Sequence, residues 1–178
     1  NPFPEAGTPM YQRIVTAYDY LRRVGAFSRG IAKELGSVDA DLAEYAGICS
    51  KVGLVSSWLM CHEAGGDVDD ENSATMDQLA PLVTEMLLSQ MRVDDLVTEC
   101  VEASNAESFQ ARGDIDVSDV VRVAVTYLPM DILGQPVSLV EDENLMEMFR
   151  KHGIGIRELD VIMEKCNLDA GSSLRMAG

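Results

Sequence analysis

The stretch EYAGICSKVGLVSSWLM, residues 44–60, decides how the fold is interpreted, because it is apolar except near its centre. Ser50 and Lys51 interrupt it there, shortly before Gly53. A buried helix has little use for a lysine, since burying a charge costs free energy unless the charge is paired. Either the two polar residues face solvent, or they stand where the fold normally places something else.

The rest of the chain has the composition of a helical protein. It has 178 residues, of which 47% are hydrophobic, and this is enough for one domain with a real core. Aromatic residues make up only 6%, and Leu, Val, Ala and Met dominate, which favours helices over a sheet sandwich. No apolar run is long enough to cross a bilayer.

The first nine residues, NPFPEAGTP, have neither the basic start nor the apolar centre of a signal peptide. We expect residues 1–9 to form an irregular lead-in, which is also what a cut inside a longer protein would leave. Residues 169–178, at the other end, are expected to form a flexible tail.

Acidic residues dominate the charge of this chain. The net charge is −16 and the isoelectric point is near 4.3. Affinity for nucleic acids comes largely from Lys and Arg that neutralise phosphates, so this chain is not expected to bind nucleic acid. The same negative field disfavours anionic membrane surfaces. Solubility alone explains the acidity.

The cysteines indicate free thiols in a reducing compartment. None of them forms a C-x-x-C pair, and all lie among apolar neighbours: Cys49, Cys61, Cys100 and Cys166. Cys49 and Cys61 would be roughly 18 Å apart on one continuous helix, too far to bridge. We therefore expect a cytoplasmic protein with neither disulfides nor a zinc site.

Hydrophobic periodicity predicts an all-α bundle of about seven helices. The expected helices cover residues 10–35, 39–63, 75–90, 94–103, 117–128, 143–151 and 156–166. Gly36 is expected to end the first helix, in which Gly25 and Gly30 would allow close approach of neighbouring helices. The only short strand candidate is QPVSLV, residues 135–140.

Motifs for metals and nucleotides are missing or incomplete. The acidic stretch DVDDEN, residues 67–72, lacks the glycine and the glutamate that a calcium loop needs, since Asn72 and Gln78 stand at those positions. It is expected to be a solvated acidic loop. The two histidines, His62 and His152, fit positions at helix C-termini. Glycine-rich phosphate-binding motifs do not occur, and no cofactor is expected.

A basic stripe lies on the first expected helix. Arg22, Arg29 and Lys33 share one face, and Arg23 lies beside them. The stripe could bind an anionic ligand, or it could be a solvated face paired with nearby acids.

Four segments together resemble an HDOD domain, a relative of the HD phosphohydrolases. In order along the chain, the segments are SRGIAKELGSVDADLAEYAGICSKVGLVSSWLM, LAPLVTEMLLSQMRVDDLVTECVEASNA, SDVVRVAVTYLPMDILG and FRKHGIGIRELDVIMEKC. The resemblance covers residues 10–168 and implies an HD-like helical bundle. The family usually carries a preceding helical subdomain that has no counterpart here, so the resemblance implies the C-terminal, HD-like part of such a domain.

The resemblance also says where a metal site would be. Ser50 and Lys51 stand where the HD family has its His-Asp pair, and Gly53 stands at its glycine. Tyr20 falls near an earlier metal-binding histidine, while Ser104 and Asn105 fall near a later pair of histidines. A lysine opposes a divalent cation, so metal-dependent hydrolysis is not expected.

HDOD domains are regarded as signalling modules, which implies a non-catalytic role through contact with another signalling protein or domain, in bacterial two-component or cyclic-dinucleotide signalling. The residues expected to line the degenerate cleft are Tyr20, Arg23, Ser50, Lys51, Ser104 and Asn105.

Three other interpretations remain open. The chain could be an HD-like phosphohydrolase or nucleotide-binding protein that uses other residues, or an unrelated all-α interaction domain. Lys51 could also be an ordinary lysine whose stem lies along the bundle. Trp58 is expected to belong to the core and not to anchor a partner.

Overall fold

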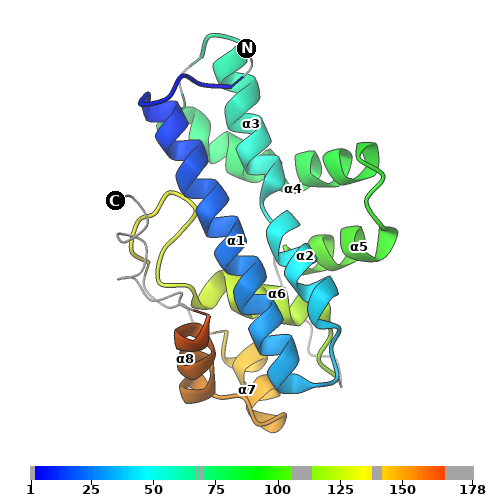
Figure 1. The fold of residues 1–178 in the computed structure, drawn as a ribbon. Coiled ribbons are helices and arrows are strands. Elements are labelled where there is room, and N and C mark those ends of the chain that lie inside the picture. Colours follow the sequence, from blue (N-terminus) through cyan, green and yellow to red (C-terminus); the bar gives the residue numbers. More distant parts are fainter. Residues whose placement is uncertain (1–2, 67, 69, 106–113, 138–141, 167–178) are drawn as a thin grey trace.

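The computed structural model describes residues 3–66, 68, 70–105, 114–137 and 142–166. The described residues form eight α-helices, which confirms the prediction of an all-α bundle of about seven (Figure 1). The helices are α1 (Pro9–Leu35), α2 (Ala40–Cys49), α3 (Val52–Glu63), α4 (Asp70–Gln90), α5 (Asp95–Ser104), α6 (Val117–Tyr127), α7 (Glu143–Lys151) and α8 (Ile156–Lys165). Within this part of the chain, no helix combines the length and the apolar content that a membrane span requires.

Helix α1 is the longest element and runs along most of the molecule (Figure 1). The Thr8 side chain caps its start by accepting a hydrogen bond from the Tyr11 backbone N–H, and Pro9 occupies the first helical position. Gly36 ends it in the left-handed conformation, with φ of 70°, and donates to the Ala32 carbonyl. The predicted stop at Gly36 is confirmed.

Two glycines let α1 and α2 touch through their backbones. A Cβ atom added to Gly47 would lie 2.9 Å from the Gly25 Cα, and one added to Gly25 would lie 2.9 Å from the Glu44 carbonyl oxygen. Further along α1, a Cβ added to Gly30 would lie 2.6 Å from Ile162 of α8. The prediction that Gly25 and Gly30 permit close helix packing is confirmed.

The predicted helix over residues 39–63 is wrong, because the chain divides into α2 and α3 at Ser50 and Lys51 (Figure 1). The Ser50 backbone N–H bonds the Gly47 carbonyl, only three residues back, at 3.3 Å, and Lys51 leaves the helical conformation with φ of −131° and ψ of 20°. This break redirects α3 onto α4, where the Gly53 N–H donates to the Thr84 hydroxyl at 3.0 Å.

The other segments differ less from the boundaries predicted from the sequence. The acidic loop predicted over residues 64–75 is shorter, because α4 already begins at Asp70. Pro136 takes part in an isolated bridge with Met130 and not in a strand, while residues 138–141 lie outside the described residues. The predicted tail, residues 169–178, and the first two residues of the lead-in also lie outside them.

The core consists of two hydrophobic clusters. The larger one joins α1 and α2 to Leu88 of α4 and to α5, α6, α7 and α8, and centres on fully buried residues that include Phe27, Ile31, Val120 and Phe149. The smaller one joins the start of α1 to α3 and α4, and contains Ile14, Ala17, Leu54, Trp58 and Ala80. Trp58 is only 1% exposed, so its predicted place in the core is confirmed.

The four cysteines carry free thiols, as predicted. Cys49 is buried and the other three are half-buried. Burial raises the pKa of Cys49, Cys100 and Cys166, which keeps these thiols protonated and unreactive near neutral pH.

Candidate functional site

Three of the six predicted site residues come together at the break between α2 and α3. The Lys51 ammonium donates a hydrogen bond to the Asn105 side-chain oxygen at 3.1 Å. The Asn105 side-chain nitrogen donates to the Ser50 carbonyl at 3.1 Å and to the Val101 carbonyl at 3.0 Å. The end of α5 is thereby fastened to the break, although the two segments are more than fifty residues apart in sequence.

Ser50 takes part in this arrangement through its backbone and not through its hydroxyl. It is only 1% exposed, and its hydroxyl donates to the Gly47 carbonyl at 2.8 Å, within its own turn. Ser50 therefore helps to end α2, and its side chain does not line a cleft.

A cleft of about 400 Å³ opens beside Lys51 and is bounded by α1, α3, α4, α6 and the segment after α6. Tyr20 lines the same cleft, as the resemblance implied. The other polar lining residues are Thr126 and two carboxylates, Asp77 and Asp131, and the remainder of the wall is apolar. Of the described residues that line this cleft, Lys51 alone is basic.

Burial shifts the pKa of both Lys51 and Tyr20. Desolvation lowers the pKa of Lys51, although the nearby Asp77 carboxylate acts in the opposite direction. Desolvation, helped by the Asp131 carboxylate, raises the pKa of Tyr20 to about 12. The phenol is therefore neutral at physiological pH, and its O–H group lies 3.5 Å from the Val125 carbonyl, a long and weak hydrogen bond.

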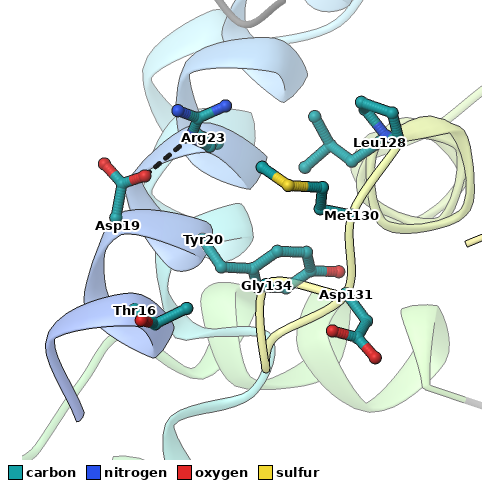
Figure 2. Close-up of a pocket in the computed structure, with 9 residues that line it drawn as sticks. Thr16, Asp19, Tyr20, Arg23, Leu128, Met130, Asp131 and Gly134 are labelled. Atoms are coloured by element: carbon teal, nitrogen blue, oxygen red, sulfur yellow. Dashed lines mark hydrogen bonds and ion pairs between the residues drawn. The ribbon is translucent and has the colours of Figure 1, made fainter. Parts of the chain in front are cut away.

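Arg23 does not reach this cleft. Its guanidinium pairs with Asp19, one turn earlier on α1, at 2.7 Å (Figure 2). Both residues line a separate pocket of about 30 Å³, on which Tyr20 and Asp131 also lie. Tyr20 thus borders two hollows, one lined by the Arg23–Asp19 pair (Figure 2) and the other by Lys51.

Ser104 also lies apart from the cleft. Its hydroxyl donates to the Val101 carbonyl at 2.8 Å, and its carbonyl accepts a hydrogen bond from Arg122 at 3.4 Å. Sequence reasoning missed Asp77 and Asp131, which supply the negative charge of the cleft. Neither has a recognisable signal, because Asp and Glu account for 30 of the 178 residues.

Two of the four residues of the basic stripe on α1 are paired with nearby acids. Arg29 bonds Asp41 at 3.0 Å and also Glu44, both on α2, and Arg23 bonds Asp19. For Arg29 and Arg23, the structure favours a face paired with local carboxylates.

The described ranges contain no group of three or more His, Cys, Asp or Glu side chains arranged to hold a metal ion. His62 lies in the last turn of α3, and His152 caps α7 with its Nδ1 atom 3.0 Å from the Met148 carbonyl. Both histidines occupy the helix ends that the sequence predicted. Of the supposed calcium loop, residues 67 and 69 lie outside the described residues, and Asn72 belongs to α4.

Comparisons of the chain with protein-family models, with curated proteins and with solved structures found no match. The fold and the site define an all-α bundle with a lysine at the edge of an acidic cleft, and the HDOD resemblance stays a prediction from the sequence motifs.

Proposed function

We propose that this chain is a non-catalytic regulatory module of the HDOD type, which acts by contact with another signalling protein in bacterial two-component or cyclic-dinucleotide signalling. One observation supports the proposal: the Lys51 ammonium is hydrogen-bonded to Asn105, and the resemblance aligns these two residues with or near metal-binding positions of HD enzymes. These positions connect α5 to the break between α2 and α3, which is a structural task.

The chemistry of the cleft supports this proposal. A fixed ammonium repels a divalent cation, and Asn105 uses its side-chain nitrogen on two backbone carbonyls. Tyr20 is a neutral phenol at physiological pH, so it offers no anionic ligand. Asp77 and Asp131 are two carboxylates beside a cation, a set better suited to an internal ion-pair network than to activation of water.

The proposal is tested first by metal content and hydrolysis. The purified protein is analysed for Mn, Fe and Zn by mass spectrometry, and assayed with p-nitrophenyl phosphate and with cyclic dinucleotides in the presence of added Mn²⁺. We expect metal well below one ion per chain and no hydrolysis above the buffer control. Stoichiometric metal together with phosphoester hydrolysis would refute the proposal and favour an HD-like phosphohydrolase.

Titration calorimetry with cyclic dinucleotides separates a protein-contact module from a nucleotide-binding protein. We expect no heat of binding. Saturable binding that disappears in Lys51→Met, but persists in the exposed control Lys33→Met, would place a nucleotide in the cleft and contradict a role through protein contact alone. The two variants remove the same charge from different places on the surface.

A further inference from the structure

Helices α4 and α5 lie side by side at one edge of the molecule and are joined by a short turn (Figure 1). Between them lies a groove of about 390 Å³. Its apolar lining consists of the buried Leu88 and Val101 and the exposed Pro81 and Leu82. Asn105 closes the inner end, so the Lys51–Asn105 hydrogen bond lies between this groove and the acidic cleft.

The groove continues toward the turn that joins the two helices. A second hollow of about 620 Å³ shares Glu85, Thr98 and Glu102 with the first, so the two form one continuous surface, which we call the α4–α5 groove. Its rim is acidic, with Asp94 and Asp95 added to the two glutamates.

Leu82 lines this groove and is exposed, and other exposed apolar side chains lie elsewhere on the same two helices and in the turn between them. Leu79, Leu82 and Met86 recur at intervals of three and four residues along α4, and each is about half exposed. Met91 in the turn and Leu96 on α5 are exposed to a similar degree or more. Among the Leu and Val side chains that line the groove, Leu82 is the one exposed to a partner.

We infer that the α4–α5 groove binds an amphipathic helix of a partner protein, with the apolar side of that helix on the apolar lining of the groove and its Lys and Arg residues against the acidic rim. The inference rests on the proposed function and names the kind of partner that the module contacts. Helix-in-groove recognition uses such a surface, with apolar anchors at helical spacing.

Charge selects a basic partner over the alternatives. Four carboxylates surround the groove, and Arg92 is the single basic residue among its described lining. A second copy of this chain would bring the same acidic rim and a net charge of −16. Like charges across an interface are unfavourable, whereas a basic helix is attracted over a distance comparable to the Debye length.

The inference is tested with two synthetic peptides of about eighteen residues, long enough to form five helical turns. Both carry Leu along one face; the remaining positions carry Lys in one peptide and Glu in the other. Binding of each labelled peptide to the whole protein is followed by fluorescence anisotropy. We expect saturable binding of one Lys peptide per chain, and binding of the Glu peptide at least about tenfold weaker.

Substitutions then locate the binding surface. Leu82→Asp is expected to weaken binding of the Lys peptide by about tenfold or more, and Leu82→Gln by less. Met60→Asp, at a comparably exposed position on α3, is expected to change binding by less than about twofold. Thermal unfolding of each variant, followed by circular dichroism, verifies that it is folded. Equal weakening by Leu82→Asp and Met60→Asp would overturn the assignment.

A second pair of variants separates the acidic rim from net charge. Glu85→Gln with Glu102→Gln is expected to weaken binding and to flatten its dependence on salt concentration. Glu34→Gln with Glu164→Gln makes the same change in net charge at exposed positions on α1 and α8, and is expected to leave binding nearly unchanged. If both pairs weaken binding equally, general electrostatic attraction explains the result and the groove is not the site.

Two further outcomes also decide against the inference. Failure of the Lys peptide to bind overturns it, but leaves the proposed function standing, since that function fails only on nucleotide binding or on metal-dependent hydrolysis. Self-association of the protein, measured by sedimentation and abolished by Leu82→Asp, would make the groove an interface between copies of this chain.

Discussion

At the scale of single residues, Lys51 acts as a connection inside the protein. Its ammonium would lose hydration on burial, and the hydrogen bond to Asn105 compensates part of that loss. Asn105 in turn satisfies two backbone carbonyls at helix ends, those of Ser50 and Val101. The Val101 carbonyl also accepts the Asn105 backbone N–H, so the bond that links separate elements is the one to the Ser50 carbonyl.

A double-mutant cycle measures this connection. Asn105→Ala removes all three hydrogen bonds and is expected to lower the free energy of unfolding by about 2 kcal/mol. Lys51→Met leaves the Asn105 oxygen unpaired but also removes a partly buried charge, so a loss of about 1 kcal/mol or less is expected. In urea denaturation, the double variant should lose less than the sum of the two. Additive losses would show that the two side chains are not coupled.

Tyr20 makes stability depend on alkaline pH. Because its pKa is raised to about 12 from the usual 10.0, the fold favours the neutral phenol. This stabilisation is complete below pH 10 and is lost as the pH rises toward 12, since the unfolded chain ionises first. Between about pH 9 and pH 11, we expect Tyr20→Phe to lose roughly 1 kcal/mol less stability than the wild type.

Urea unfolding of the two proteins over this pH range provides the measurement. Ionisation of Cys49, Cys100 and Cys166 also lowers the stability of the protein there, but these thiols are the same in both proteins and their effect cancels in the difference. Parallel curves for wild type and Tyr20→Phe would mean that the phenol is not desolvated as the structure has it.

Part of the site could be predicted from sequence. The positions of Lys51 and Asn105 followed from the motifs, but the hydrogen bond between them could not, since it depends on how α5 lies against the break. For Arg23 the predicted place in the cleft was wrong. It shares α1 with Tyr20, but its side chain pairs with Asp19 and does not reach the cleft. Spacing along one helix is readable from sequence, whereas contact between separate helices is not.

At the scale of elements, the break between α2 and α3 depends on Gly53. A Cβ atom at this position would lie 2.3 Å from the Ala80 carbonyl oxygen and 2.4 Å from the Thr84 backbone nitrogen. Both atoms belong to the backbone of α4, so they cannot move aside without moving the helix. The absence of a side chain at Gly53 therefore allows α3 and α4 to touch.

Gly53→Ala is consequently expected to lower the free energy of unfolding by about 2–3 kcal/mol, because α3 must shift away from α4. The matched control is Met60→Ala on the exposed side of the same helix, where a change within about 0.5 kcal/mol is expected. Thermal unfolding of the wild type and of both variants measures these losses of stability. Similar small losses in the two would indicate that the contact between α3 and α4 tolerates a methyl group.

Helix existence was easier to predict than helix continuity. Asp116, for example, caps the start of α6, because its side chain accepts hydrogen bonds from the backbone N–H groups of Ser118 and Asp119. The break at Ser50 and Lys51 has no such local signal, since the surrounding apolar residues suit one long helix. It arises from packing against α4, and a tertiary contact of this kind overrides local propensity.

At the scale of the whole molecule, the charge of −16 works against the fold. A compact chain brings its carboxylates closer together than the unfolded chain does, and added salt screens this repulsion. Raising NaCl from about 20 mM to about 500 mM should therefore increase Tm by about 4 °C, which corresponds to roughly 1 kcal/mol or slightly more. A differential scanning calorimetry series in NaCl measures this, and an unchanged or lower Tm would contradict it.

The division of the core into two clusters has a consequence for partial unfolding of the protein. The smaller cluster holds most of α3 and the first half of α4 against the beginning of α1, while the larger cluster holds α2 and contacts Val52 and Val55 at the start of α3. A continuous helix over residues 40–63 would couple the two clusters, but the break separates their hydrogen-bond ladders. Partial unfolding can then release α3 and leave α2 in place. In hydrogen–deuterium exchange, the amides of α3 should exchange well before those of α2, and equal protection of both helices would show one cooperative unit.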